Sequence, residues 1–369
     1  MALSDVTVKV NLVTSVGVEP VWFPLLFVDK SNDPTLATKI PYTECTSLGQ
    51  LETLIAAVTE KDTKAEKKAK QEKARGTALY QAAHTMFLQS GHPNRFAVVN
   101  AGKEDGGSLE KIQALLAPYL DKNWRQLVAV NTTELKTTYQ LMDWVENLEQ
   151  RKLFFLRMDP ANATYTDTAD GDKKYALSDY TRTVAVYGAD TSAVYSVVGA
   201  TSGKVPGSLN YRNVIVQGAK AAALSAEELE ALHTSGIMAL VERAGDVVTS
   251  TGKSASGERY LDTIDIEDYV VEQLIYSIQR AMNVNDIVPY NNDGIAILEN
   301  AAAGVMLDCC DKGMIAKTDT NSYDYQVSFP GMTFVPQEDI ANRAYKLGTV
   351  AFTVQGAIDR VAVTVDMTI

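Results

Sequence analysis

Two short segments carry residues that could bind a phosphate group. Residues 251–254 read TGKS, which contains the Gly-Lys-Ser end of a phosphate-binding loop. Val247 occupies the position of the first glycine, so this loop cannot wrap its backbone amides around a phosphate. Residues 199–204, GATSGK, are one residue too short for the same loop. The sequence also contains no GxGxxG after an expected strand and no GxSxG, so dinucleotide binding and α/β-hydrolase chemistry lack a motif.

Histidines and carboxylates are the residues of this sequence that could act as metal ligands or bases. The three histidines are His84, His92 and His233, and they form neither HExxH nor a close pair. A group of carboxylates, Asp262, Asp265, Glu267 and Asp268, does not have the spacing of a calcium loop. Negative charge is stabilised at a helix N-terminus, so we predict that a helix begins at Asp265 and that these carboxylates belong to its start.

Cysteine chemistry is equally unsupported. Cys45, Cys309 and Cys310 form no CxxC pair, which argues against a zinc site and against a disulfide framework. We expect the adjacent pair to act as small buried hydrophobic residues. The residues therefore predict no catalytic site, no metal and no cofactor, and a protein that is not an enzyme.

Composition and charge narrow the class of protein further. The chain has 369 residues, of which 46% are hydrophobic and 22% charged, enough for two or more folded domains. Its formal net charge of −12 argues against a nucleic acid partner. The first residues lack a basic stretch followed by an apolar core, and no apolar run would span a bilayer, so we expect no membrane insertion and folding in a cytoplasm.

Short apolar runs separated by helical patterns predict the fold. Expected strands are 22–28, 95–100, 127–130, 153–157 and 182–187, and expected helices are 48–58, 79–89, 109–120, 137–150 and 225–233. This alternation is typical of a sheet, at least partly parallel, covered by helices. Residues 159–180 read as a loop or domain boundary, and 193–202 as a stretch of small residues. A last helix, 293–312, carries the apolar stripe Ile295, Leu298, Ala302 and Val305.

The charged run 60–75 allows two interpretations. It is either a basic patch for nucleic acid or a solvated helix face with mixed charges. We favour the second, because no aromatic residue is interleaved for base stacking.

Both ends of the sequence alternate between apolar and polar residues. Strands with one apolar face are predicted by Val6, Val8, Val10 and Leu12 and by Val361, Val363, Val365 and Met367. Such strands have unpaired amides, which are a template for strand addition.

Several segments, in their order along the chain, resemble the tail sheath proteins of contractile phages, in particular their short, simple subunits. They are FPLLFVDK, IPYTECTSLGQLETLI, ALYQAAHTMFLQSGHPNRFAVV, RTVAVYG with VPGSLNYRNVIVQG, and the sequence from TSTGKSASGERYLDTIDIEDYVV through IVPYNNDGIAILENAAAGV to GTVAFTVQGAIDRVAVTVDMTI. The likeness covers most of the chain and is strongest from Arg182 to Ile369. The charged run 60–75 departs from it and looks like an insertion.

The resemblance implies a mixed α/β (α+β) subunit with two domains and two arms. These are an N-terminal arm (1–22), an outer α/β domain (23–178), a core sheath domain (179–348) and a C-terminal arm (349–369). The arms would pair with neighbouring sheath subunits and knit hexameric rings into a helical mesh. The subunit would contract around an inner tail tube protein, with Glu299, Asp308, Asp311, Lys312 and Lys317 near the tube. Its other partners would be baseplate and tail terminator proteins, in a virion tail assembled in the host cytoplasm.

Two alternatives stay open at the level of sequence. The particle could be a phage tail, a phage-tail-like bacteriocin or another contractile injection particle. The chain could also be an α/β enzyme of unknown chemistry, favoured only by its helix–strand alternation.

Overall fold

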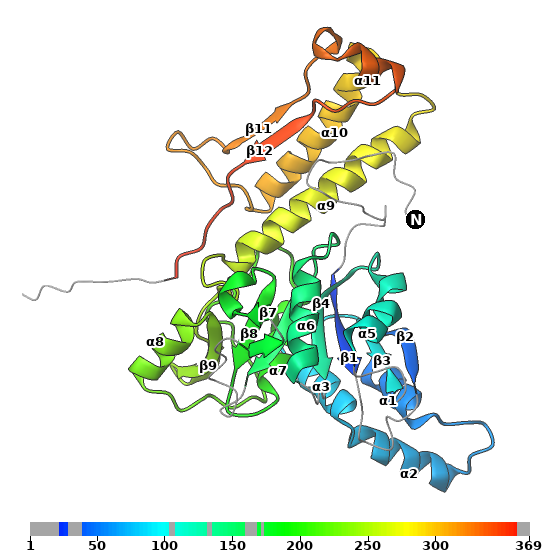
Figure 1. Cartoon of the computed structure of the whole chain (residues 1–369), viewed down its shortest axis with the longest axis vertical. Helices are drawn as coiled ribbons and strands as arrows, with labels where there is room; N and C mark the ends of the chain where they lie inside the picture. Colours follow the sequence, from blue (N-terminus) through cyan, green and yellow to red (C-terminus); the bar gives the residue numbers. More distant parts are fainter. Residues whose placement is uncertain are drawn as a thin grey trace, which may run out of the picture.

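The computed structural model describes residues 22–28, 39–102, 108–130, 135–158, 168–170 and 173–359 (Figure 1). The strands are β1 (Phe23–Val28), β2 (Ile40–Cys45), β3 (Phe96–Asn100), β4 (Trp124–Val130), β5 (Leu153–Met158), β6 (Thr168–Asp170), β7 (Lys173–Tyr175), β8 (Thr183–Tyr187), β9 (Ile237–Arg243), β10 (Asp246–Thr249), β11 (Tyr325–Ser328) and β12 (Thr349–Phe352). The α-helices are α1 (Leu48–Ala56), α2 (Lys64–Arg75), α3 (Ala78–Phe87), α5 (Leu109–Leu116), α6 (Leu135–Glu146), α7 (Ala193–Thr201), α8 (Ala226–Thr234), α9 (Leu261–Val284), α10 (Asn292–Asp311) and α11 (Gln337–Ala341). Short 3-10 turns are η2 (Ala117–Tyr119), η3 (Leu177–Asp179) and η4 (Met332–Phe334).

One large sheet organises the first two thirds of the chain. Its eight strands have the order β10-β9-β8-β5-β4-β1-β3-β2. Neighbouring strands from β9 to β3 are parallel, and the two outermost strands, β10 and β2, are antiparallel to their neighbours. The central strands are buried on both faces, so β1 and most of β3 are continuous apolar runs, whereas β4 is continuously apolar only after Gln126. The predicted mixed α/β class is confirmed.

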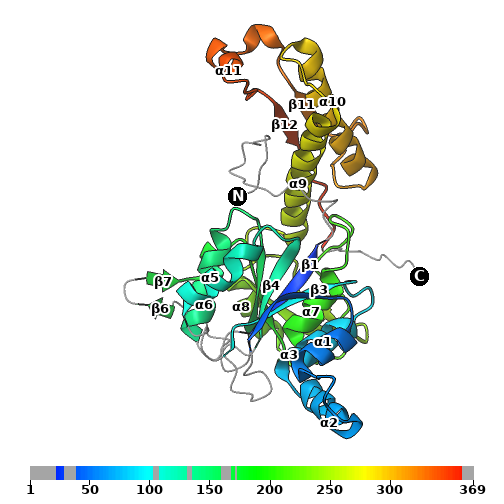
Figure 2. The same cartoon turned by 90° about the vertical axis from the view of Figure 1, so that its right-hand side faces the viewer.

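Helices cover both faces of this sheet (Figure 2). Apolar side chains of α1, α3 and α7 pack on one face, including Leu51, Met86 and Val198. Those of α5, α6 and α8 pack on the other, including Ile112 and Leu232. We call the sheet with these helices the sheet lobe. The charged helix α2 projects from it, at the end of the molecule opposite α10 (Figure 1).

A second group of elements stands apart from the sheet. Helix α9 leaves the sheet lobe and packs along α10, and the antiparallel pair β11–β12 lies on α10 (Figure 1). Their shared core contains Tyr269, Met306 and Cys309, with Val327 and Val350 of the two strands packed against it. We call α10, β11, β12 and the C-terminal part of α9 the helical lobe. Of the apolar stripe predicted on α10, Ala302 and Val305 belong to this core, whereas Ile295 is buried but is not part of it and Leu298 is half-buried.

Two predicted features differ from the structure. Helix α9 begins at Leu261, not at Asp265, so the prediction of its start was wrong by four residues. The stretch 193–202 forms helix α7, and all nine of its residues are buried. Helix α7 approaches α3 closely at Gly199, where a Cβ would lie 2.5 Å from the carbonyl oxygen of Met86. This position therefore requires a glycine.

The structure describes only some of the predicted domain and arm boundaries. The sheet continues across the expected boundary between residues 178 and 179, because β5 pairs with β8. Residues 349–352 of the predicted C-terminal arm form β12, which pairs with β11 of the same chain. The arm residues Val6, Val8, Val10, Leu12, Val361, Val363, Val365 and Met367 lie outside the described residues.

Candidate functional site

Three arginines meet at one edge of the large sheet. Arg125 is the second residue of β4, Arg151 lies two residues before β5, and Arg182 immediately precedes β8. These strands are parallel, so their amino ends lie at the same edge. The base of helix α9 packs against this edge and carries the acidic partners of the arginines (Figure 1).

Two aspartates of α9 bind the three guanidinium groups. Nη2 of Arg125 lies 2.8 Å from Oδ1 of Asp265 and 2.5 Å from Oδ2 of Asp268. Arg182 donates to both oxygens of Asp268, at 2.9 and 3.0 Å, and Arg151 donates to its Oδ1 at 2.9 Å. Asp268 is 0% exposed and Asp265 8%. We call these five residues the Arg–Asp cluster.

Further polar groups enclose the cluster. The hydroxyl of Tyr211 donates to Oδ2 of Asp265 at 2.5 Å, and the guanidinium of Arg125 lies 4.6 Å from the centroid of the Trp22 ring. The Trp22 indole in turn donates to Glu272 of α9 at 2.9 Å. Buried Lys152 donates to the carbonyl oxygens of Lys122 and Trp124, at 2.8 and 2.6 Å.

Burial and neighbouring charge act on the pKa values of these groups in different directions. Burial would raise the pKa of Asp268, but Arg125, Arg182 and Arg151 hold it at about 2. For Asp265, burial prevails over Arg125 and Tyr211 and raises the pKa of the carboxyl. Burial lowers the pKa of Lys152 to about 7, and Arg125 adds to the effect. Asp268 is therefore firmly ionised, whereas Lys152 loses its proton near neutral pH.

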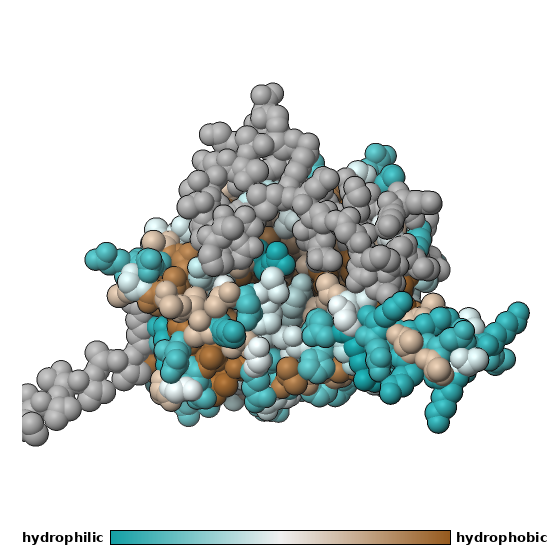
Figure 3. Space-filling model, turned by 90° about the horizontal axis from the view of Figure 1, so that it is seen from below, coloured by the Kyte–Doolittle hydropathy of each residue, from teal (hydrophilic) through white to brown (hydrophobic). Residues whose placement is uncertain are grey.

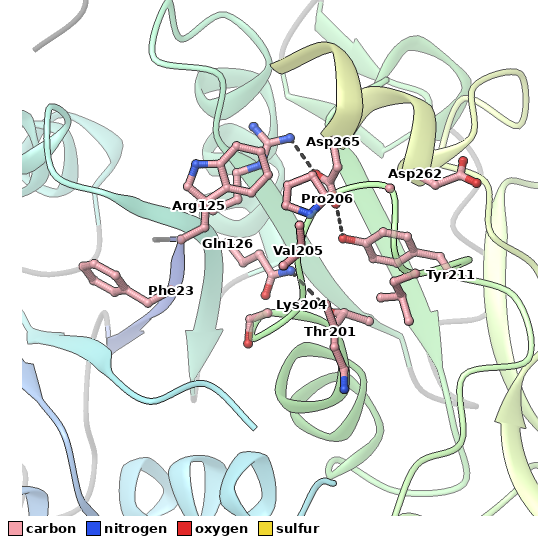
Figure 4. A pocket seen from close by; sticks show the side chains of 14 residues that line it. Phe23, Arg125, Gln126, Thr201, Lys204, Val205, Pro206, Tyr211, Asp262 and Asp265 are labelled. Carbon is pink, nitrogen blue, oxygen red and sulfur yellow. Dashed lines mark hydrogen bonds and ion pairs between the residues drawn. The ribbon is translucent and has the colours of Figure 1, made fainter. Parts of the chain in front are cut away.

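The space beside the cluster is small. A pocket of about 20 Å³ is lined by Arg125, Gln126, Tyr211 and Asp265, with Thr201 and Val205 opposite (Figure 4). That volume holds about one water molecule, whereas pockets for small-molecule ligands measure roughly 300–1,000 Å³. Figure 4 shows Arg125 and Tyr211 both directed at Asp265. The pocket leaves no room for a substrate, although the buried Nε of Arg125 and Oε1 of Gln126 have no hydrogen-bond partner among the described residues.

The position of the cluster also indicates a structural role. Open parallel sheets bind ligands at the carboxyl ends of their strands, and this cluster lies at the amino ends. The segments that follow β1, β4 and β5 at the carboxyl edge lie outside the described residues. What the cluster does is join α9, and with it the helical lobe, to three strands of the sheet lobe.

The interpretation of the acidic group as a helix start was wrong for Asp265 and Asp268. Only Asp262 lies in the first turn of α9, while Asp265 and Asp268 lie deeper and form ion pairs. Glu267 pairs with Arg259 at 2.5 Å. A signal for the cluster was present, because an arginine stands at or just before the start of three apolar strands. The sequence does not show, however, which helix crosses that edge.

The other chemical candidates are used structurally. Nζ of Lys253 donates to the carbonyl oxygen of Gly257 at 2.9 Å, within its own loop, so TGKS forms no phosphate cradle. His233 Nε2 lies 2.8 Å from the Ser250 hydroxyl, and Glu230 lies 4.0 Å from His233 Nδ1, an arrangement like that of a hydrolase. Ser250 is 0% exposed and accepts a bond from the amide of Ala239, so a substrate cannot reach it.

The described residues offer neither a metal site nor a membrane-spanning helix. Within the described ranges, no three His, Cys, Asp or Glu side chains are grouped to hold a metal ion. None of the helices described here is both long and apolar enough to cross a bilayer. Cys45, Cys309 and Cys310 are buried and free, and burial raises the pKa of Cys45 to about 11 and that of Cys309 to about 12.

Of the five residues predicted to face a tube, four lie close together and Glu299 lies apart from them. Asp308, Asp311, Lys312 and Lys317 are exposed at or just beyond the C-terminal end of α10. There Lys312 donates to Asp308 at 2.6 Å and to the Tyr269 hydroxyl at 2.7 Å. Glu299 is half-buried and precedes Asp311 by twelve residues, about 18 Å along a helix. The structure therefore does not bring Glu299 together with the others.

Comparisons with known proteins identify the fold. No protein-family model matches the sequence, and no curated protein matches it. A chain of the anti-feeding prophage baseplate, solved by cryo-electron microscopy with six-fold symmetry, is similar over 100% of both chains, with a TM-score of 0.66 and 15% identity. The contracted sheath complex of PVC, an extracellular contractile injection system, covers 100% of this chain and 98% of its own, with a TM-score of 0.60 and 14% identity. A sheath tail protein from Listeria innocua matches over 85% of this chain and 89% of its own, with a TM-score of 0.56 and 10% identity.

Proposed function

We propose that this chain, which has the fold of contractile tail sheath proteins, is a structural subunit of such a sheath. It polymerises around an inner tube and contracts to drive that tube through a target envelope. The observation that carries the proposal is the correspondence of fold over the whole chain with proteins of contractile particles. The resemblance in sequence, which was drawn from the residues alone, points the same way.

The partners follow from this role. Neighbouring sheath subunits, the inner tube protein, and the baseplate and terminator proteins would contact the chain, which would reside in the tail of the particle. Two of the matched structures come from the anti-feeding prophage and from an extracellular injection system. A phage-like injection particle is therefore as well supported as a phage tail.

Terminal arms would link the subunits. We propose that residues 1–22 and the C-terminal residues through 369 add strands to neighbouring subunits. The pair β11–β12 supports this, because each of its strands has one edge without a partner strand among the described residues. Such edges accept an added strand through backbone hydrogen bonds.

The Arg–Asp cluster suits a part that must transmit force. A subunit that moves during contraction needs its lobes to hold their relative position under load. Buried ion pairs with several mutual hydrogen bonds fix geometry well, because removing one partner leaves an uncompensated charge. We propose that the cluster keeps the outer sheet lobe and the helical lobe together, with the exposed end of α10 toward the tube.

An enzymatic role has less support. The pocket beside the cluster admits about one water, and the His233–Ser250 pair is inaccessible. We propose that the protein is not an enzyme and needs no cofactor.

Electron microscopy of the purified full-length chain tests the proposal, alone and with the tube protein. Rings or tubes are expected. A chain that stays monomeric under both conditions, and turns over a nucleotide or ester at enzyme-like rates, would overturn it.

A further inference from the structure

Helix α2 carries a surplus of positive charge in an acidic protein. Residues 60–75 hold seven Lys or Arg and four Asp or Glu, a net charge of +3, so the remaining residues carry −15. Three of the seven positive side chains form ion pairs, in the contacts Lys70–Asp62, Arg75–Glu52 and Lys68–Glu72. Lys64, Lys68 and Lys73 are exposed on the helix.

The helix is built to keep its shape as it projects. Thr63 and Glu66 form a capping box at its N-terminus, and Lys73 and Arg75 occupy its last turn, where positive charge is favourable. Ala65 and Ala69, one turn apart, are exposed between the lysines. An exposed alanine pair allows another surface to approach the helix closely. Figure 3 shows the hydrophilic projection that results.

A groove lies near the opposite end of the sheet. Its volume is about 420 Å³, and its walls come from Ala221–Leu224, Leu229 of α8, and Val241, Glu242 and Arg243 of β9. The walls are mostly small or apolar. Glu227, Glu228 and Glu230 are exposed on α8, the helix that contributes Leu229, and Glu242 is exposed on β9. Glu242 and Arg243 add one charge of each sign to the walls, so small and apolar positions lie beside a surplus of acidic residues from α8 and β9.

The two surfaces cannot meet within one chain. Helix α2 packs on α1, which lies beside β2 at one end of the sheet, while the groove lies at β9, next to the other end. Figure 1 shows α2 and α8 at different sides of the sheet lobe. A contact between two different surfaces of like chains repeats from copy to copy and generates a ring or a helix.

We infer that α2 of one subunit docks along the α8–β9 groove of a neighbouring copy of this chain. The exposed alanines of α2 lie against the apolar walls, and its lysines face the glutamates of α8 and β9. This inference rests on the proposed function, because it describes a lateral contact between the outer lobes of sheath subunits. It also gives the charged run, which departs from the family pattern, a role in assembly.

A charge-swap experiment on the full-length chain tests the contact. Lys64→Glu with Lys68→Glu should raise the concentration at half-assembly about fivefold, which equals about 1 kcal/mol. Adding Glu227→Lys with Glu230→Lys in the same chain should restore assembly. The control, Lys122→Glu with Lys204→Glu, makes the same change in net charge at exposed positions away from both surfaces and should assemble as the wild type does.

Chemical cross-linking shows which residues of neighbouring chains are in contact. Carbodiimide coupling joins amines to carboxylates that are in contact, so assembled wild-type chains should yield cross-links between α2 lysines and the glutamates of α8 or β9. Circular dichroism confirms that each variant is folded. If wild-type chains assemble but the Lys64/Lys68 variant assembles equally well, or the swap fails to restore it, the inference is wrong and the proposed function stands. If folded wild-type chains never assemble, both fail.

Discussion

Arg182 and Asp268 form a two-pronged ion pair at the base of α9, with Nη1 and Nη2 each donating to a different carboxylate oxygen at 2.9 and 3.0 Å. Arg182 directly precedes β8, and Asp268 lies 86 residues later along the chain. Two parallel hydrogen bonds fix the orientation of both groups as well as their separation. The pair therefore sets the direction in which α9 leaves the sheet.

Removal of the Asp268 charge should destabilise the fold strongly. Asp268→Asn leaves three buried or partly buried arginines with too little negative charge, so we expect the free energy of unfolding to fall by about 3–5 kcal/mol. Denaturant unfolding measures the change. Asp311→Asn, at an exposed position, is the control and should stay within about 0.5 kcal/mol. Equal stability of the two variants would contradict the role given to the cluster.

Lys152 should make stability depend on pH on the alkaline side. Its pKa is about 7 in the folded chain and 10.5 as the ordinary value, so between these limits the unfolded chain binds the extra proton. The contribution of Lys152 to stability therefore rises with pH from about 7 to 10.5. Lys152→Met should remove this rise, seen as a smaller slope of the unfolding midpoint against pH. Parallel slopes for both proteins would disprove it.

Gly199 should tolerate no side chain. Gly199→Ala places a Cβ 2.5 Å from the Met86 carbonyl oxygen and forces α7 away from α3, which should cost about 1–3 kcal/mol. Gly304→Ala is the matched control, since it also lies within a helix, α10, but a Cβ there meets nothing within 4 Å. That control should gain up to about 1 kcal/mol, because alanine favours a helix. Thermal unfolding of both variants measures the contrast.

Loss of an arm should abolish assembly without unfolding the subunit. Deletion of residues 1–13, or Val363→Pro, removes backbone donors or apolar contacts that an added strand requires. We expect folded monomers by circular dichroism and no tubes by electron microscopy. Val363→Thr keeps the backbone donor and the β-branched shape, and should still assemble. Full-length tubes from the deleted chain would refute the arm model.

The end of α10 should affect tube binding alone. Asp311→Lys with Lys312→Glu reverses two exposed charges, and we expect weaker co-sedimentation with tube protein by a chain that stays folded, with its melting temperature lowered only by loss of the bonds from Lys312 to Asp308 and Tyr269. Asp121→Lys with Lys122→Glu makes the same exchange in the sheet lobe and should bind normally. Unchanged binding by the α10 variant would remove these residues from the tube surface.

Much of the fold could be predicted from apolar periodicity. Strands such as β1 and β3 are continuous apolar runs because helices bury both their faces, and α8 shows its capping box, Ser225 with Glu228, in the sequence itself. Helix α7 escaped prediction because its valines, threonine and glycine have low intrinsic helix propensity. Tertiary packing against α3 overrides that propensity.

The site was less predictable than the fold. In the sequence alone, Asp265 and Asp268 fit a helix start, because negative charge is favourable there. Their real partners precede them by 86 to 140 residues, and only the sheet topology brings those arginines together. A pattern of charges cannot reveal such long-range pairing without knowledge of the strand order.

Helix α9 also has a mechanical consequence. It has 24 residues, which makes it about 36 Å long. The Arg–Asp cluster binds it near its N-terminal end, and α10 packs along its C-terminal part. The ion pairs of Asp265 and Asp268 thus fix the base of α9 while its other end extends into the helical lobe. A tilt of about 10° at Asp268, which lies 16 residues or about 24 Å before the last residue of α9, would displace that end by roughly 4 Å. By resisting such a tilt, the three arginines keep small displacements at the base of α9 from becoming larger shifts of the helical lobe.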